Sequence, residues 1–270
     1  MDGDATAAVG VGVARRASAL AAHSLTILAG TRLLVRELTI EIQAGEFIAV
    51  LGRNGCGKTL TLHALAGLGT PSAGEVHLHG TPLRELKRRA IARQLGVLMQ
   101  DREEGLPTSV LESVLIGRHP HLKALQWESA ADREIARACL ERVELGALAE
   151  RALETLSGGE QRRVAIAALL AQDPGVLLLD EPTNHLDPHH QIAVLELFHD
   201  LTRAGRAVVA TLHDPTLAAR FADRALLLFG DGRWRFGPAA EVLTTESLGE
   251  LYLTRMVELE SSGRRVFVSA

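Results

Sequence analysis

The segment EFIAVLGRNGCGKTL, which runs from Glu46 to Leu60, decides the fold. Its first part, Glu46 to Leu51, is a short apolar run that ends at a glycine, which is typical of a buried strand. Its second part, Gly52 to Thr59, fits the pattern G-x-x-x-x-G-K-[ST], and a helical pattern follows from Lys58 to about Ala66. A glycine-rich loop between a strand and a helix is the setting in which this pattern binds phosphate groups.

The residue types of this loop match that chemistry. Glycines let the backbone N–H groups curl around phosphate oxygens, and the N-terminus of the following helix adds a partial positive charge. Lys58 supplies a full positive charge near the terminal phosphates, and the Thr59 hydroxyl can ligate Mg²⁺. The predicted nucleotide-binding residues of the loop are Gly52, Arg53, Asn54, Gly55, Cys56, Gly57, Lys58 and Thr59.

Cys56 lies inside the loop and allows two interpretations. In the first, the position accepts any small residue. In the second, the helix N-terminus sensitises the thiol, so that its alkylation blocks nucleotide binding. We favour the first.

A pair of carboxylates supports the nucleotide interpretation. The apolar run from Val176 to Leu179 is followed by Asp180 and Glu181. A buried strand would deliver Asp180 beside the phosphate loop, where it can hold Mg²⁺ directly or through water. Glu181, one residue on, can take a proton from an attacking water.

Strand and helix patterns alternate along much of the chain, which implies a mostly parallel sheet covered on both faces. A helical block from about residue 104 to 171 interrupts the alternation, so we expect an inserted all-helical subdomain. Gly230-Asp-Gly232 indicates a hairpin. The other predicted strands are Glu75–His79, Leu95–Met99, Ala207–Leu212 and Arg224–Phe229, and the other predicted helices are Leu83–Arg93, Ser109–Gly117, Ala130–Leu145, Gly159–Ala171, His189–Ala204 and Thr216–Phe221.

The composition describes a folded globular protein and excludes a disordered chain. The 270 residues are 47% hydrophobic and carry a formal net charge of -4. This balance, without a basic block, argues against nucleic acid as a partner. The few aromatic residues (six Phe, two Trp, one Tyr) argue against a base-stacking platform.

The longest apolar runs, such as Val164 to Ala171, are too short to span a bilayer. The N-terminal segment, residues 1–23, begins with acidic residues and contains Arg15-Arg16, so it does not fit a signal peptide. We predict that it is a disordered extension. Two cysteines make no disulfide framework, and a reducing cytoplasm is the simplest location.

The motif Leu156-Ser-Gly-Gly-Glu-Gln161, placed between the phosphate loop and the carboxylate pair, resembles the ATP-binding subunit of an ABC transporter. The resemblance covers about residues 24–255. It implies a P-loop NTPase fold of the RecA-like type, with a mostly parallel core sheet, an antiparallel edge and a helical subdomain. The expected division is a core of residues 24–103 and 172–235, a subdomain of 104–171, and C-terminal helices with a final strand in 236–270.

In this family the Ser-Gly-Gly segment binds the γ-phosphate held by a second subunit. Ser157, Gly158 and Gly159 at the start of a helix suit an anion site. The resemblance therefore implies a homodimer in which each chain forms half of each ATP site, with ATP and Mg²⁺ as the bound groups.

Three further positions carry over from the resemblance. Gln100 matches a glutamine that contacts Mg²⁺ or the attacking water, and His213 matches a histidine that contacts the γ-phosphate. Asp187 matches a residue that organises the opposite site of the dimer. Glu181, His213 and Gln100 are thus the expected catalytic residues, and Thr59, Gln100 and Asp180 the expected metal ligands.

The sequence departs from the family in the region that contacts adenine. Family members usually have an aromatic residue near the end of the first strand, but here Leu28 or Ala29 takes that place. We expect weaker adenine stacking and poor discrimination between ATP and GTP. His23 or Arg32 could fill the gap.

Several stretches resemble importers of iron–siderophore, haem and cobalamin chelates, among them Gly117–His121 and Pro182–Gln191. This implies two transmembrane permease subunits, a periplasmic or lipoprotein substrate-binding protein, and a peripheral position on the cytoplasmic face of the inner membrane. A permease helix should dock within Asp101–Trp127. The alternatives are the ATPase of an exporter, or a non-transport relative acting on ribosomes or DNA.

Overall fold

The computed structural model describes residues 18–100, 108–123 and 126–270. Its central sheet has six strands in the order β10-β9-β3-β8-β7-β6. The five strands from β9 to β6 run parallel, and β10 pairs with β9 in the antiparallel direction at one edge. The predicted core sheet with an antiparallel edge is confirmed. Its strands are β3 (Phe47–Leu51), β6 (Leu95–Leu98), β7 (Val176–Leu179), β8 (Ala207–Thr211), β9 (Arg224–Leu228) and β10 (Trp234–Pro238).

A second, antiparallel sheet has the order β2-β1-β4-β5. It contains β1 (Ser18–Ala29), β2 (Arg32–Gln43), β4 (Ala73–Leu78) and β5 (Thr81–Pro82). The prediction that the extension reaches residue 23 is wrong, because β1 starts at Ser18 and buries Ala19 to Ala22. Residues 1–17 of that extension lie outside the described residues. The strand predicted at Glu75–His79 forms, but in this second sheet.

The core consists of two apolar layers, one on each face of the central sheet. Every residue of β3 is buried. Phe47, Ala49 and Leu51 pack into one layer, whereas Ile48 and Val50 pack into the other. This alternation on a strand covered on both sides explains the uninterrupted apolar run in the sequence.

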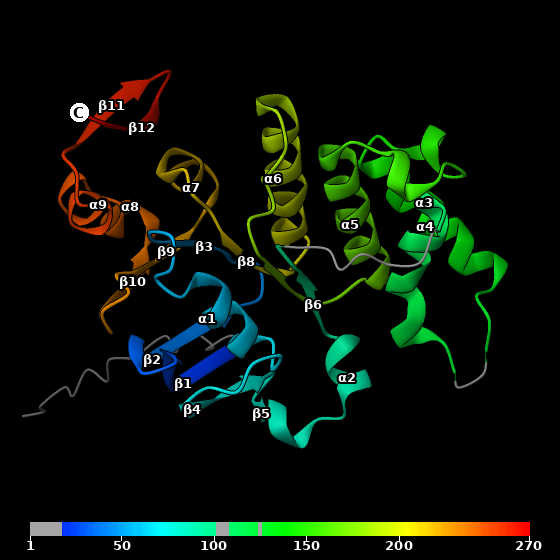
Figure 1. The fold of residues 1–270 in the computed structure, drawn as a ribbon, viewed down its shortest axis with the longest axis horizontal. Helices are drawn as coiled ribbons and strands as arrows, with labels where there is room; N and C mark the ends of the chain where they lie inside the picture. The colour runs from blue at the N-terminus through cyan, green and yellow to red at the C-terminus, as the bar shows by residue number, and fades with distance from the viewer. Residues whose placement is uncertain (1–17, 101–107, 124–125) are drawn as a thin grey trace, which may run out of the picture.

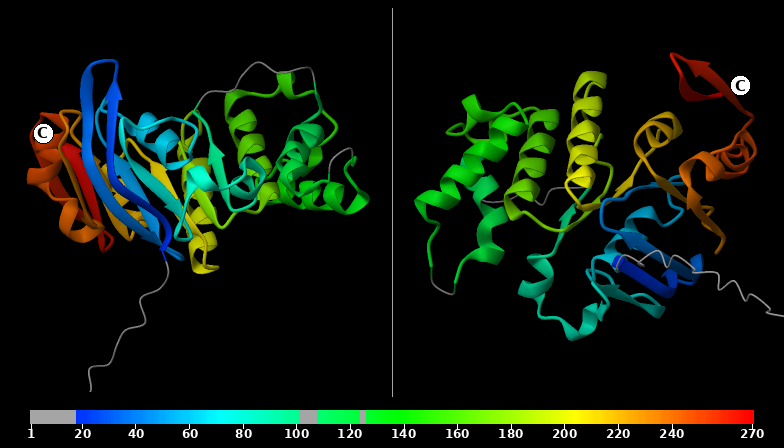
Figure 2. Two further views of the ribbon diagram at one scale, coloured as in Figure 1. Left: turned by 90° about the horizontal axis from the view of Figure 1, so that it is seen from below. Right: turned by 180° about the vertical axis from the view of Figure 1, so that it is seen from behind.

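Three helices form a group at one end of the molecule, away from the C-terminal hairpin at the other end (Figures 1 and 2). They are α3 (Val110–Leu115), α4 (Ala130–Arg142) and α5 (Gly158–Gln172). The predicted helix that extended to Gly117 instead changes to a 3-10 helix, Ile116–His121. Helix α6 (Pro188–Arg203) stands between this group and α7 (Pro215–Phe221).

Arg118 ties the helical group together. Its Nε donates to Asp132 Oδ1 at 2.9 Å and its Nη1 to the Ala171 carbonyl at 2.8 Å. Hydrogen bonds from Ser129 and Arg118 lower the pKa of Asp132 to about 2. The Gly117–His121 stretch thus connects α4 and α5.

The helix predicted over Leu83–Arg93 also differs from the structure. It is a 3-10 turn (Leu83–Glu85) and a short helix α2 (Arg88–Ala92), with extended backbone between them. Leu83, Leu86 and Ile91 all pack into one core layer, so tertiary packing overrides the helical pattern.

The C-terminal region ends in two strands rather than one. Helices α8 (Ala239–Val242) and α9 (Thr245–Tyr252) lead into β11 (Met256–Ser261) and β12 (Arg264–Ser269), which pair as a hairpin. No helix among the described residues is long and apolar enough to cross a membrane.

Candidate functional site

The phosphate loop joins β3 to α1 (Lys58–Leu65) and leaves the N-terminus of α1 open. Gly57 is the N-cap and has a φ of 106°, a conformation that L side chains rarely adopt. A Cβ atom there would also lie 3.2 Å from Leu34. No side chain of the described residues caps this helix. The first N–H groups of α1 are therefore available to an anion.

Lys58 is held over the loop by the loop's own backbone. Its Nζ donates to the Gly52 carbonyl at 2.9 Å and to the Arg53 carbonyl at 3.5 Å. Its side chain is buried, being only 6% exposed. The ammonium group is therefore preorganised at the place where phosphate groups would bind.

Asp180 follows β7 and is completely buried. Its Oδ1 accepts a hydrogen bond from Thr211 Oγ1 at 2.7 Å. Its Oδ2 is buried without a hydrogen-bond partner among the described residues. An orphaned carboxylate oxygen is costly unless a further donor or cation satisfies it. The oxygen ligands of Asp180, Thr59 and Gln100 thus fit the hard cation Mg²⁺.

Glu181 is the centre of a hydrogen-bond network. Its Oε1 lies 2.6 Å from His213 Nε2, and its Oε2 accepts from Gln100 Nε2 at 3.1 Å and also from Asn184 Nδ2. Its own N–H donates to Thr211 Oγ1 at 2.8 Å. Its φ of 50° turns it away from the line of β7, so that Asp180 and Glu181 face different partners. A carboxylate held by three side chains is fixed in orientation.

These groups meet at one cavity of about 530 Å³. Eight of the predicted site residues line it, which are Asn54, Gly55, Gly57, Lys58, Thr59, Gln100, Glu181 and His213. Its other lining residues are Ala29, Leu34, Leu60 and Asn184. Gly52, Arg53, Cys56 and Asp180 are not among the lining residues of this cavity in the described part of the chain.

Ser157, Gly158 and Gly159 do not line this cavity within the described part of the chain. Ser157 caps α5, because its Oγ accepts from the Glu160 N–H at 3.3 Å and donates to Glu160 Oε2 at 2.7 Å. Gly159 lies so close to His185 that a Cβ atom would be 2.9 Å from the His185 carbonyl oxygen. Among the described residues, the Ser-Gly-Gly segment therefore contributes nothing to the phosphate-loop cavity of its own chain.

Asp187 also lies outside the cavity and caps α6. Its Oδ1 accepts from the His190 N–H at 2.9 Å, and its Oδ2 lies 2.8 Å from His190 Nδ1. These hydrogen bonds hold the pKa of Asp187 below its usual value. The carboxylate is thereby fixed at the start of α6.

Cys56 fits the first of the two interpretations. Its side chain is 3% exposed, and burial raises the pKa of its thiol. A Cβ atom on Gly52 would lie 2.4 Å from Cys56 Sγ, and one on Gly230 would lie 2.9 Å from Cys56 Cα. The close approach of Gly52 and Gly230 favours a small side chain at this position, and burial outweighs the lowering effect of Lys58 on the pKa of the thiol.

The side of the cavity next to β1 carries aliphatic residues. Ala29 and Leu34 line it, whereas Leu28 does not. The two candidates for an adenine contact have other partners: the His23 ring packs on the His77 ring at 4.6 Å, and Arg32 Nη2 donates to the Gly230 carbonyl at 3.1 Å.

Sequence reasoning missed three residues of the site. Asn184 and Thr211 contact the carboxylates as described above. Arg162, in α5, donates to the Glu181 carbonyl at 2.8 Å and to the carbonyls of Asp180 and Met99. Asn184 could have been found, since it lies between Glu181 and Asp187. The roles of Thr211 and Arg162 depend on contacts that no motif reveals.

Comparisons with known proteins agree with this site. The family described as ABC transporter matches residues 35–184. The hemin import ATP-binding protein HmuV of Deinococcus radiodurans is 46% identical over 227 residues, covering 82% of this chain and 85% of that protein. The ferric enterobactin transport ATP-binding protein FepC of Escherichia coli is 35% identical, covering 89% of each.

Two solved structures are similar in fold. One is an inward-facing conformation of a metal-chelate type ABC transporter, with a TM-score of 0.81 and 30% identity, covering 94% of this chain and 98% of that one. The other is a dimeric, post-hydrolysis ATP-binding cassette bound to ADP and Pi, with a TM-score of 0.71 and 28% identity, covering 82% of this chain and 98% of that one. This chain belongs to the ABC transporter family and is the ATP-binding, ATP-hydrolysing subunit of a transporter.

Proposed function

We propose that this subunit powers the import of a metal chelate (an iron–siderophore, haem or cobalamin) by hydrolysing ATP at a head-to-tail homodimer. One observation carries the catalytic part of the proposal. Glu181 is buried at the mouth of the phosphate-loop cavity and is held there by His213, Gln100 and Asn184.

ATP binding uses the phosphate loop. The N–H groups at the open end of α1 donate hydrogen bonds to the phosphate oxygens, and Lys58 exchanges its contacts with the Gly52 and Arg53 carbonyls for phosphate oxygens. When bound, Mg²⁺ would neutralise part of the phosphate charge, held by Thr59, Asp180 and Gln100. The orphaned Oδ2 of Asp180 is consistent with that role.

Hydrolysis uses Glu181 as the general base. Its carboxylate takes a proton from the attacking water, whose oxygen forms the new bond to the γ-phosphorus as the bond to the ADP oxygen breaks. His213 and Gln100 lie within hydrogen-bond reach of Glu181 and orient the groups around the water. The rigid hydrogen-bond network keeps the carboxylate in place.

The position of Ser157 supports a shared site. Because the Ser-Gly-Gly segment does not line the chain's own cavity within the described residues, it is placed to meet a nucleotide held by a second copy, provided that the Ser157–Glu160 capping box rearranges. In the proposed dimer, Ser157, Gly158 and Gly159 contact the γ-phosphate bound by the partner, and Asp187 packs across the interface. ATP binding then closes the dimer, and hydrolysis reopens it.

The partner proposal rests on a groove between the core and the helical group. It has a volume of about 800 Å³, and among its lining residues are Met99, Gln100, Ile116 and His119. Met99, Ile116 and the nearby Trp127 are exposed apolar side chains, Trp127 being 85% exposed. An exposed apolar groove of this kind suits a helix of a permease subunit. The predicted docking segment also includes residues 101–107, which lie outside the described residues.

The relatives' names support import of a chelate, since they include hemin and ferric enterobactin transport proteins. The proposed assembly is this homodimer with two permease subunits and a substrate-binding protein. It places the chain at the cytoplasmic face of the inner membrane as a peripheral subunit.

An uptake experiment tests the function. In a strain that lacks the gene, the wild-type chain should restore uptake of labelled haem, ferric siderophore or cobalamin, and Glu181→Gln expressed at the same level should not. Restored efflux instead of uptake would overturn the importer and support an exporter.

A further inference from the structure

The loop that carries His213 connects β8 to α7. Asp214 caps α7, since its Oδ1 accepts from the Thr216 N–H at 2.7 Å, and Pro215 occupies the first turn. His213 itself is the residue of this loop that contacts Glu181. The position of its imidazole therefore depends on what holds residues 213–216.

The C-terminal segment holds this loop at both of its ends. At the first end, the Tyr252 hydroxyl at the end of α9 donates to the His213 carbonyl at 3.4 Å. At the other end, Thr216 Oγ1 accepts from the Phe267 N–H at 3.0 Å and lies 3.4 Å from the Phe267 carbonyl, in β12.

The Thr216–Phe267 contacts are part-buried, whereas the Tyr252–His213 hydrogen bond is exposed. Phe267 is buried, and burial together with the nearby Asp214 carboxylate raises the pKa of Tyr252 well above its usual value. The Tyr252 hydroxyl thus stays protonated and able to donate.

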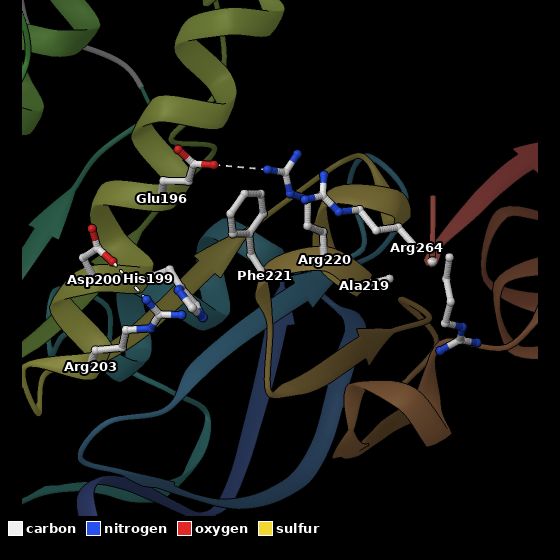
Figure 3. Close-up of a pocket in the computed structure, with 10 residues that line it drawn as sticks. Glu196, His199, Asp200, Arg203, Ala219, Arg220, Phe221 and Arg264 are labelled. Carbon is white, nitrogen blue, oxygen red and sulfur yellow. Dashed lines mark hydrogen bonds and ion pairs between the residues drawn. The ribbon is translucent and has the colours of Figure 1, made fainter. Parts of the chain in front are cut away.

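The C-terminal half of α7 borders a cleft. Helices α6 and α7 and the hairpin turn enclose a cleft of about 670 Å³ (Figure 3). Across it, Arg220 Nη2 contacts Glu196 Oε1 at 3.1 Å, and the Arg220 guanidinium lies over the Phe221 ring. An exposed ion pair contributes little, and this one lies near the end of α7, away from residues 213–216.

From this geometry we infer that the C-terminal segment, through Tyr252 and β12, is a clamp that positions His213 against Glu181 for hydrolysis. Tyr252 and Thr216 are positioning residues in this arrangement. The inference rests on the proposed catalytic roles of Glu181 and His213. It concerns residues beyond 184, outside the part of the chain that the family match covers.

The test compares Thr216→Val with Thr216→Ser in the full-length chain. Valine has the shape of threonine but lacks the hydroxyl, whereas serine keeps it. We expect Thr216→Val to lower kcat about fivefold with the ATP Kd within about twofold of the wild type, and Thr216→Ser to keep most of the activity. Tyr252→Phe should lower kcat about threefold, because its hydrogen bond is longer.

A second experiment, in the His213→Ala variant, distinguishes loss of His213 positioning from a general loosening of the fold. In His213→Ala, which should itself be strongly impaired, adding Thr216→Val should change kcat no further. Thermal melting of each variant checks that it is folded. An unchanged kcat in Thr216→Val and Tyr252→Phe would overturn the clamp while leaving the proposed function intact, and so would an equal further loss in the His213→Ala background. Full activity of His213→Ala would instead refute the role of His213 in the proposed function, and the clamp with it.

Discussion

Helices α1 and α5 both begin with glycine-rich sequences, yet their N-termini are capped differently. In α1 the N-cap is Gly57, and the first turn, Lys58 to Thr61, contains no acidic residue. In α5 the N-cap is Ser157, and Glu160 in the first turn completes a capping box. One helix end is open, and the other is satisfied by its own side chains.

The difference teaches how the two phosphate sites that we propose for one chain would be unlike. At α1 an anion meets free N–H groups and the Lys58 ammonium group. At α5 the Glu160 carboxylate already occupies the Ser157 N–H and hydroxyl, at 2.8 and 2.7 Å. An anion must displace or reorient that carboxylate. We therefore expect ATP to bind first at α1 of one chain and to recruit α5 of the other afterwards.

The largest expected effect is on chemistry at the open site. Glu181→Gln should lower the rate of ATP hydrolysis by about 10²–10⁴-fold, because the general base is lost. ATP binding should persist, so that a dimer accumulates in ATP and is visible by size-exclusion chromatography. A variant that hydrolyses at the normal rate would remove Glu181 as the base.

Binding at α1 should depend on Lys58. Lys58→Ala should weaken ATP binding by about 100-fold, since charge-assisted hydrogen bonds to the phosphates disappear. A titration with a fluorescent ATP analogue measures this, with Ser157→Ala as the control that keeps binding. Equal losses in the two variants would break the proposed distinction between the helix ends.

Dimer formation should depend on the capped N-terminus of α5, here called the closed site. Ser157→Ala removes the α5 cap, which costs about 1 kcal/mol of stability, and we expect ATP-dependent dimerisation and hydrolysis to fall about tenfold. Ser157→Thr keeps a hydroxyl and should retain most activity. Normal dimerisation of Ser157→Ala in the Glu181→Gln background would show that the α5 end does not contact the nucleotide.

The next prediction concerns the selectivity of the phosphate-loop cavity at α1 between ATP and GTP. Because Ala29 and Leu34 line the cavity where an aromatic residue is usual, the ATP and GTP Kd values should differ by less than about tenfold. Ala29→Tyr should tighten ATP binding by about tenfold or less, through stacking. A strong preference of the wild type for ATP would point to another group on the base.

The smallest effect is a pH dependence at the closed site. Hydrogen bonds from Ser157 lower the pKa of Glu160 below its usual 4.5. The folded state thus favours the ionised form, and this stabilisation is complete above pH 4.5 and is lost as the pH falls toward the folded-state pKa. Glu160→Gln should lower the free energy of unfolding at pH 7 by less than about 1 kcal/mol. The difference from the wild type should shrink below pH 4.5 in denaturant titrations, and a constant difference would contradict it.

The sequence predicted the core sheet well and the outer sheet poorly. The strand at β3 is recognisable because it is apolar throughout and leads into the phosphate loop. Strands β1 and β2 escaped prediction because register shifts interrupt their pairing, near Ala22 to Leu28 among other places. The φ values of Ser24 (50°) and Glu37 (50°) break the alternation of buried and exposed residues on which a strand prediction depends.

The site was predictable where motif order fixed the residues. Lys58, Gln100, Glu181 and His213 come together at one cavity, as the resemblance implied. The sequence could not show that Thr211 bridges Asp180 and the Glu181 N–H. It also could not show that Arg162 donates hydrogen bonds to three carbonyls of the site. These interactions join groups that lie far apart in the sequence and meet only when α5, β6, β7 and β8 pack together.

The burial of both cysteines has a practical consequence for spectroscopy. Cys56 and Cys139 are enclosed, and burial raises the pKa of each thiol, so reagents that attack thiolates find little to react with. A single cysteine at an exposed position such as Glu134 in α4 would then be the preferred labelling site, without removal of the native cysteines. Spin labels on two copies would report directly how the helical groups of a dimer move during each catalytic cycle.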